Sequence, residues 1–384
     1  MPEMRRRRAA ALCFSIIIIV SLLAGCAGGG IYANYSAIED LQLVKTLAVD
    51  RAGAEGTALT VSTGSGAGKA SLVVRGEGGG LLEAIDALRD RTPRGELFFD
   101  HTRFIVLGED YAAAGIRALL DFTERDVQLR LGTELFVLRG AEAGPLVTAA
   151  AETDGGAGEA LDSVKRAVSA RADSSVQDLR RTAVALSEYG AALVCAIAPA
   201  DTEGGFVPAG YAVLRDGALA GYLEGGEAEA ASLLTDSAAR FLRRASLPDG
   251  GGATLLCEPE GVALAVEWRG DAPPVLVAEV RLAAVVTEIE GDAQSVTDPA
   301  ALAALSAAAE AQVRRDIEAV LARSRDWGAD FLALGGVLRR SDAARFAALG
   351  TGWLRELDYT VAVRCAVAHS YDLNDPVGTE GGGV

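Results

Sequence analysis

Apolar and polar residues alternate in several short runs of the chain, and apolar residues at helical spacing fill the segments between them. Alternation with a period of two is typical of strands, whereas a spacing of three or four residues is typical of helices. The alternation predicts strands at 41–50, 57–63, 96–108, 133–140, 191–198, 275–291 and 359–370. The helical spacing predicts helices at 81–91, 110–122, 176–186, 227–242 and 300–323.

Two segments also predict how neighbouring strands connect. Between residues 96 and 140 the order strand, helix, strand indicates a crossover between parallel strands. The first of these strands is apolar on both faces, so we expect both faces to be covered. The run 210–223 carries Asp216-Gly217 between two apolar halves, which predicts a hairpin with a two-residue turn.

The amino terminus has the three parts of an export signal. Arg5 to Arg8 form a basic block, and Ala9 to Ala24 form an uncharged apolar segment. Leu23-Ala24-Gly25-Cys26 then fits a bacterial lipobox, in which small residues precede a cysteine that receives a diacylglyceryl group. Two acyl chains anchor a protein stably, because each buried methylene contributes about 0.8 kcal/mol. We therefore expect cleavage before Cys26 and attachment to the membrane through diacylglyceryl-Cys26.

Two alternatives stay open for this segment. No charge follows until Glu39, so an uncleaved membrane helix has sufficient length. Ordinary secretion without a lipid is the other alternative. Gly28 to Gly30 favour the lipoprotein, because a glycine-rich tether continues a helix poorly and makes a flexible spacer.

The net charge of the chain argues against some classes of binding partner. The 384 residues carry a net charge of −17, and removal of residues 1–25 takes away four arginines and Glu3, which leaves −20. Such a chain repels nucleic acids, so we expect no nucleic-acid partner. The same charge predicts that the protein stands off an anionic membrane.

The five cysteines do not form a disulfide or zinc pattern. Cys13 and Cys26 belong to the amino-terminal segment. Cys195, Cys257 and Cys365 are an odd number without CxxC spacing, and each lies in an apolar run. We expect these three to be buried structural thiols.

No segment carries a recognisable catalytic pattern. The stretch 63–70 approaches a phosphate-binding loop, but Thr63 replaces its first glycine and Ala70 replaces its hydroxyl residue. The two histidines, His101 and His369, both fall in predicted strands, where a structural role is more common than catalysis. The sequence therefore predicts no catalytic residue, no cofactor and no metal site.

The order of several segments carries a family resemblance. After the lipobox come "YSAIEDLQLVKTLAVDRAG" (35–53), the His-containing stretch from "LFFDHTRFIVLG" to "TELFVLRG" (97–140), the hairpin "GYAVLRDGALAGYL", and a carboxyl-terminal segment with Gln312, Asp330-Phe331 and Trp353. This order resembles the Ger(x)C family, the lipoprotein C subunits of nutrient germinant receptors in endospore-forming bacteria.

The resemblance implies an α+β fold of three mixed α/β domains, built on mostly antiparallel sheets with covering helices. The expected segments are a signal peptide (1–25), a lipid anchor and tether (26–34), an N-terminal domain (35–200), a middle domain (201–292), a C-terminal helix-plus-sheet domain (293–372) and a disordered tail (373–384). For His101, Arg103, Asp330 and Trp353 two roles stay open, structural packing and a subunit interface.

The resemblance also implies a function. We expect a non-enzymatic, lipid-anchored subunit of a nutrient germinant receptor, in complex with the integral-membrane A and B subunits. Its expected location is the outer face of the spore inner membrane, and its expected role is nutrient-triggered germination. The alternative is a stand-alone solute-binding lipoprotein that serves a transport system.

Overall fold

The computed structural model describes residues 41–64, 71–125, 129–235, 237–246, 251–270, 272–290 and 299–368. The predicted signal peptide, the lipobox with Cys26, His369 and the predicted tail lie outside these residues. By their internal contacts, Leu43–Pro93 and Leu97–Val384 form one compact unit. Of the second unit, Met1–Gln42 with Arg94–Glu96, only Leu41, Gln42 and Arg94–Glu96 are described.

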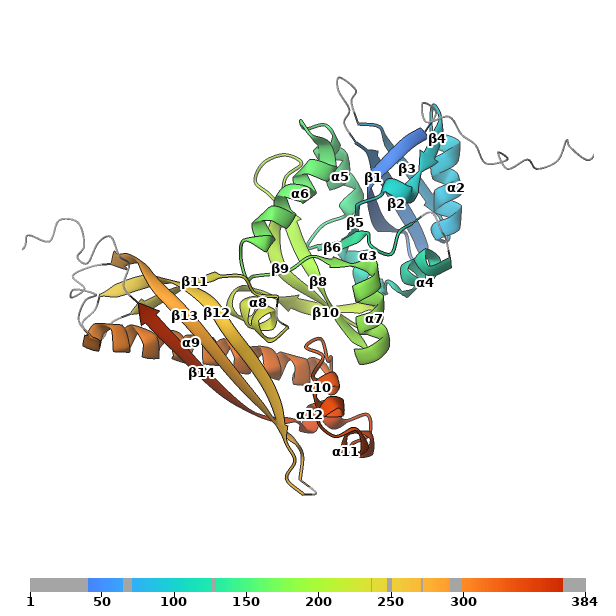
Figure 1. Cartoon of the computed structure of the whole chain (residues 1–384). Coiled ribbons are helices and arrows are strands. Elements are labelled where there is room, and N and C mark those ends of the chain that lie inside the picture. Colours follow the sequence, from blue (N-terminus) through green and yellow to red (C-terminus); the bar gives the residue numbers. More distant parts are fainter. Residues whose placement is uncertain are drawn as a thin grey trace, which may run out of the picture. The chain divides into compact units, whose positions relative to one another are not determined.

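The described residues contain a ten-stranded sheet (Figure 1). Its strands are β1 (Leu41–Ala52), β2 (Gly56–Thr63), β3 (Val73–Gly78), β4 (Glu96–Phe98), β5 (Phe104–Gly108), β6 (Glu134–Leu138), β7 (Gln177–Asp178), β8 (Ala191–Pro199), β9 (Phe206–Arg215) and β10 (Ala218–Leu223). The main path runs β10-β9-β8-β6-β5-β1-β2-β3. Strands β1, β5, β6 and β8 are parallel to one another. The outer pairs β1-β2, β2-β3, β8-β9 and β9-β10 are antiparallel.

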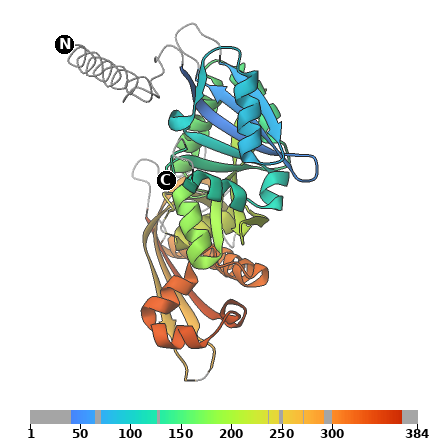
Figure 2. The same ribbon diagram turned by 90° about the vertical axis from the view of Figure 1, so that its right-hand side faces the viewer.

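Helices cover both faces of the parallel strands. They are α2 (Leu81–Arg91), α3 (Glu109–Ala114), α4 (Arg117–Arg125), α5 (Ala143–Ala151), α6 (Gly156–Ser169) and α7 (Leu179–Tyr189). Ile105 and Leu107 of β5 pack with α2, α3, α4 and α7 on one face. Phe104 and Val106 pack with α5 and α6 on the other face. Figure 2 shows α2 lying across the strands that it covers. The prediction of a strand covered on both faces is confirmed.

Two predicted elements in this region are broken. The predicted strand 96–108 is interrupted by a 3-10 helix, Phe99–His101, so His101 does not lie in a strand. The predicted helix 110–122 divides into α3 and α4 at Gly115, whose φ of +115° is incompatible with an α-helix. The crossover itself is confirmed, because β5 and β6 pair in parallel.

The predicted hairpin forms and extends the same sheet. Its strands are β9 and β10, and the turn residues Asp216 and Gly217 have φ values of 52° and 85°. Two successive positive φ angles are the conformation that a two-residue hairpin turn requires. Because β9 pairs with β8, the sheet contains strands from both sides of residue 200. The six-segment division of the chain stays a prediction.

A second sheet has four strands in the order β11-β12-β13-β14. The elements of this part are α8 (Gly225–Leu234), β11 (Phe241–Ser246), β12 (Gly252–Glu267), β13 (Val275–Glu290), α9 (Pro299–Trp327), α10 (Leu334–Ser341), α11 (Ala343–Ala348), α12 (Trp353–Glu356) and β14 (Asp358–Ala368). Helix α9 lies along one face of this sheet (Figure 1) and packs its apolar stripe against it. The predicted helix 227–242 is wrong in its second half, where β11 forms.

The described part of the chain is therefore a mixed α/β protein, as the sequence predicted. Antiparallel pairs predominate in both sheets, and helices cover them. Cys195, Cys257 and Cys365 are free and buried, which confirms their expected burial.

Candidate functional site: an acidic pocket and an aromatic pocket

Asp50 is a buried carboxylate near the end of β1. Its two oxygens accept hydrogen bonds from the backbone N–H groups of Ala143 and Gly144, each at 2.7 Å. Those N–H groups belong to the first turn of α5, which has no intrahelical partners for them. Asp50 is only 4% exposed, so this aspartate joins β1 to α5 inside the protein.

Two glycines make room for the Asp50 carboxylate. A Cβ on Gly108 would lie 2.1 Å from Asp50 Oδ1. A Cβ on Gly144 would lie 3.0 Å from Asp50 Oδ2 and 2.7 Å from Thr60 Oγ1. Neither glycine has a positive φ, so the close approach of the carboxylate, rather than the backbone conformation, requires them.

The environment of Asp50 shifts the pKa of its carboxyl group upward. Burial raises the pKa of its carboxyl group, because desolvation disfavours the charged form. The hydrogen bonds from Ala143 and Gly144 oppose this effect, and the nearby Glu142 carboxylate adds to it. The net direction is upward from the ordinary value.

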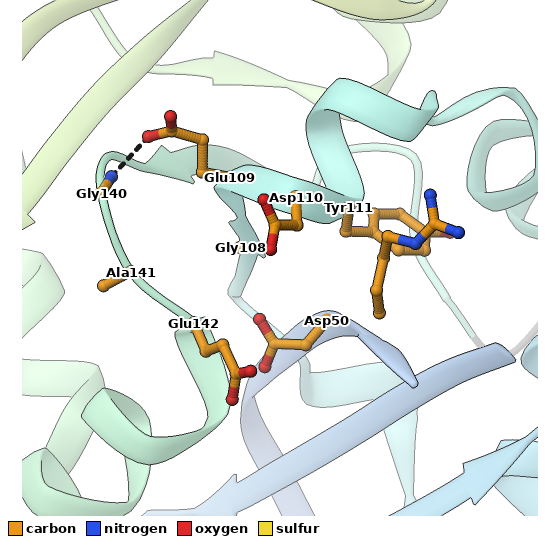
Figure 3. A pocket seen from close by; sticks show the side chains of 9 residues that line it. Asp50, Gly108, Glu109, Asp110, Tyr111, Gly140, Ala141 and Glu142 are labelled. Atoms are coloured by element: carbon orange, nitrogen blue, oxygen red, sulfur yellow. Dashed lines mark hydrogen bonds between the residues drawn. The ribbon is translucent and has the colours of Figure 1, made fainter. Parts of the chain in front are cut away.

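An acidic pocket of about 380 Å³ opens beside Asp50. Its charged lining residues are Asp50, Arg51, Glu109, Asp110 and Glu142. Figure 3 shows the carboxylates of Asp50, Asp110 and Glu142 pointing into the same space. Four carboxylates and one guanidinium favour a cationic occupant over an anionic one. Among the described residues no group of acidic, histidine or cysteine side chains has a metal-binding arrangement.

Glu109 closes one side of the acidic pocket. Its carboxylate accepts a hydrogen bond from the Gly140 backbone N–H (Figure 3). It accepts a second hydrogen bond, at 3.0 Å, from the Tyr222 hydroxyl. Burial and the adjacent Glu109 carboxylate raise the pKa of Tyr222, so its hydroxyl remains a donor. The guanidinium of Arg139 lies over the Tyr222 ring, 4.9 Å from its centre.

The acidic pocket lies at one end of the parallel strands, next to the connections that follow them. The pocket lies at the carboxyl ends of β5 and β6, where the chain continues into α3 on one face and α5 on the other. Adjacent strands whose connections leave on opposite faces create a crevice, and open α/β sheets bind ligands in such crevices. Its geometry therefore suits ligand binding.

A second buried aspartate, Asp330, repeats the arrangement of Asp50. Its oxygens accept hydrogen bonds from the Leu334 and Gly335 N–H groups at the start of α10, at 2.7 and 2.8 Å. Burial raises the pKa of the Asp330 carboxyl group to about 7, although both hydrogen bonds oppose the shift. This carboxyl group therefore changes its charge near neutral pH.

An aromatic pocket of about 180 Å³ lies next to Asp330. Trp353 and Phe346 form part of its lining, and their rings meet edge to face with centres 5.5 Å apart. A Cβ on Gly335 would lie 3.1 Å from the Trp353 ring, so this glycine allows the ring to approach α10. Asp330 and Trp353, both singled out in the sequence, thus line one cavity.

His101 and Arg103 lie together elsewhere, beside a cavity of about 400 Å³. The Arg103 guanidinium binds both oxygens of Asp162, at 2.7 and 2.6 Å. The His101 ring packs against Phe98 with centres 5.8 Å apart. The structure therefore divides the four predicted positions into two pairs, and their role at an interface stays a prediction.

The sequence reasoning did not single out Asp50. One signal was available, because Asp50 ends an apolar strand-forming run in which a charge needs a partner once it is buried. The partners themselves come from residues 93 and 94 positions later, which no local pattern shows.

Comparison with known proteins places the chain in a family. Residues 34–198 match the family described as "Spore germination protein N-terminal domain", and residues 209–371 match "Spore germination B3/GerAC like, C-terminal". The chain belongs to the GerAC family of spore germination proteins. The recognition of this family from the order of its segments is confirmed.

A solved structure supports the fold. The protein described as "Crystal Structure of the GerBC protein" is similar to this GerAC-family chain, with a TM-score of 0.55 and 17% sequence identity. The similarity covers 84% of this chain and 96% of the other chain. Curated proteins give no match.

Proposed function

We propose that this chain is a non-enzymatic, lipid-anchored subunit of a nutrient germinant receptor and is needed for nutrient-triggered spore germination. The observation that carries the proposal is the pair of family matches, which together span residues 34–198 and 209–371. The similarity to GerBC over most of both chains supports the same assignment. The proposed partners are two integral-membrane subunits, A and B.

The proposed attachment to the membrane is covalent. Cys26 would carry the diacylglyceryl group, and Leu23, Ala24 and Gly25 would form the recognition site for cleavage. None of the helices in the described segments has the length and apolar character that crossing a bilayer requires. The proposed location is the outer face of the spore inner membrane.

Substitution of the anchor residue tests the attachment. Cys26→Ala should prevent lipidation, so that labelling with a radioactive fatty acid is lost and the precursor keeps its full mass. Cys13→Ala is the matched control, because Cys13 lies in the same apolar segment but outside the lipobox. Equal fatty-acid labelling of the two variants would contradict the proposed anchor.

Deletion of the gene tests the function. Spores that lack this protein and its paralogues should lose, or strongly slow, the release of dipicolinic acid in response to at least one nutrient. Germination triggered by added calcium dipicolinate should be unaffected, which controls for general spore damage. Normal responses to every nutrient would rule out the proposed role.

A further inference from the structure

The amino-terminal edge of the parallel strands carries a group of cations. Lys45 lies in β1, and its carbonyl oxygen accepts a hydrogen bond from the Arg103 N–H just before β5. Arg103, Arg130 and Lys165 line the cavity of about 400 Å³ at this edge, together with His101. Four residues with carboxyl or hydroxyl groups complete its polar lining, namely Asp100, Thr102, Thr133 and Glu134. We call this region the cationic edge.

In the ion pairs of the cationic edge, the basic side chain is more exposed to solvent than its acidic partner. The pairs are Arg103–Asp162, Arg130–Asp100, Lys165–Glu134 and Arg180–Asp178. In each pair the arginine or lysine side chain is the more exposed partner; for example, Arg180 is 68% exposed and Asp178 is 19% exposed. The carboxylates thus lie beneath the cations, and the outer layer of this edge is positive.

Ion pairs elsewhere vary in which partner is more exposed. In Arg89–Asp86 of α2 the side chains are 41% and 62% exposed, so the acid is the more exposed partner. In Arg323–Glu227, between α9 and α8, the cation is the more exposed partner, as it is at the cationic edge. The cationic edge therefore differs in another respect, because three such cations line one cavity there.

Two buried polar atoms beside this cavity have no hydrogen-bond partner among the described residues. Thr102 is 95% buried, and its Oγ1 has no hydrogen-bond partner among the described residues. A hydroxyl group can donate to an oxyanion, and a buried hydroxyl without a partner costs free energy. Glu134 Oε2 also lacks a hydrogen-bond partner, while the other Glu134 oxygen pairs with Lys165.

The direction of the chain relates this edge to the proposed anchor. Strand β1 begins at the cationic edge, and its first residue, Leu41, is 15 positions after Cys26 in the sequence. A segment of that length spans at most about 50 Å. The acidic pocket lies at the opposite, carboxyl ends of β5 and β6.

We propose that the cationic edge docks on the anionic surface of the membrane, with the phosphate group of a phospholipid bound in the cavity beside Arg103, Arg130, Lys165 and Thr102. This inference rests on the proposed lipid anchor. Paired guanidinium and ammonium groups can still donate to phosphate oxygens, because each has donors that its carboxylate partner leaves free. The rest of the strongly acidic surface is then directed away from the bilayer.

Headgroup quenching of a fluorophore tests the docking. The processed lipoprotein would be reconstituted in phosphatidylcholine vesicles, with or without about one third phosphatidylglycerol, that contain a lipid with a nitroxide on its headgroup. A fluorophore would be attached at Leu131→Cys on the cationic edge or at Val285→Cys on β13, since both native side chains are 39% exposed. We expect at least twofold stronger quenching at position 131, only with phosphatidylglycerol, and its loss in high salt.

Neutralising variants separate the cavity from charge in general. Arg103→Gln, Arg130→Gln and Lys165→Gln together should abolish the extra quenching at position 131. The matched control combines Arg269→Gln, Arg339→Gln and Arg345→Gln, which removes three exposed cations from the part of the chain that contains the second sheet. This control should leave the extra quenching at position 131 unchanged. Circular dichroism would confirm folding, and the salt titration of the unaltered protein tests the proposal if the first variant does not fold.

The outcomes distinguish this inference from the proposed function. Failure of the protein to float with the vesicles would contradict the lipid anchor itself. Flotation with equal quenching at positions 131 and 285, or with quenching independent of phosphatidylglycerol, would overturn the docking alone. Inorganic phosphate should reduce the quenching more than chloride at the same ionic strength; equal effects of the two salts would overturn the phosphate site.

Discussion

Asp50 and Asp330 each provide hydrogen-bond acceptors for the unpaired backbone N–H groups at the start of a helix, in different parts of the protein. Each carboxylate binds two successive backbone N–H groups at the start of a helix, and each has a glycine where a Cβ would collide or crowd. Burial raises the pKa of both groups, so the helix starts gain a partner at a cost in desolvation. The balance between the hydrogen bonds gained and the desolvation of the carboxyl group depends on pH, because only the ionised carboxylate carries the charge that burial disfavours.

The stability of the protein should carry a pH signature of Asp330. Its pKa is about 7 in the folded protein and 3.8 for an unperturbed carboxyl group, so the folded state holds the proton more tightly. The corresponding stability is fully present below pH 3.8 and is lost as the pH rises through 7. Asp330→Asn removes this titration, because an amide does not ionise.

Urea unfolding followed by circular dichroism at several pH values measures the effect. Between pH 4 and pH 8 the free energy of unfolding of the unaltered protein should fall by up to about 4 kcal/mol relative to that of Asp330→Asn. All other groups titrate in both proteins and cancel in the difference. Parallel curves for the two proteins would contradict the raised pKa.

Gly108 should tolerate no side chain. Its Cβ would lie 2.1 Å from Asp50 Oδ1, so Gly108→Ala must displace the buried carboxylate from the start of α5. We expect the free energy of unfolding to fall by about 2–4 kcal/mol. Gly80→Ala is the matched control, because Gly80 also precedes a helix and a Cβ there meets nothing within 4 Å. A similar, small loss of stability in both variants would show that the Asp50 contact is dispensable.

At the level of elements, the sequence predicted best where one face of a helix or strand is buried. The bounds of α2 and the turn of the β9–β10 hairpin agree with the pattern that predicted them. The predicted helix 227–242 is wrong beyond Leu234, where α8 ends, and its last two residues belong to β11, from which Phe241 faces the core. Pairing with β12, a long-range contact, decides the conformation there.

The element contacts of the second sheet include an ion triad that the sequence does not show. Arg243 of β11 binds Glu229 of α8 and Asp316 of α9, and its side chain is largely buried. Burial raises the pKa of both carboxyl groups, while Arg243 opposes the shift. One guanidinium therefore holds two helices and a strand together.

Removal of Arg243 should be costly. Arg243→Met leaves two partly buried carboxylates without their cation, and we expect a loss of about 3–5 kcal/mol in the free energy of unfolding at pH 7. The loss should shrink at low pH, where the carboxylates become protonated. Thermal unfolding at pH 7 and pH 4.5 would measure it, and Arg117→Met provides an exposed control. A pH-independent loss would indicate lost packing instead of lost charge pairing.

For the whole molecule, net charge is a poor guide to where charges lie. The net charge calculated from the sequence is −17, and from this value we expected the protein to be repelled by an anionic membrane. The structure separates an acidic pocket at the carboxyl ends of the parallel strands from the cationic edge at their amino ends. Composition cannot reveal this separation, because Arg103, Arg130 and Lys165 line one cavity only when the parallel strands and α6 are packed together.

Thiol counting tests the processing of the whole chain. The chain has five cysteines, of which cleavage before Cys26 removes Cys13 and lipidation blocks Cys26. The denatured membrane form should therefore react with thiol reagents at three sites, Cys195, Cys257 and Cys365. The native form should react slowly, since all three are buried and burial raises the pKa of Cys195 to about 12. A fourth reactive thiol in the denatured protein would mean that Cys26 is unmodified or that the segment with Cys13 is retained.

The hydrogen bonds between Asp50 and the start of α5 also have a consequence for the order of events during folding. Asp50 lies in the first strand of the sheet, but its partner Ala143 is 93 residues further along the chain. A ribosome extends a chain by about 5–20 residues per second, so β1 waits several seconds or more before α5 exists. Until then, its carboxylate has no backbone donors from α5, although β2 and β5 are synthesised earlier and can already pair with β1. The strand order of this part of the sheet can therefore form before the Asp50 side chain obtains its partners.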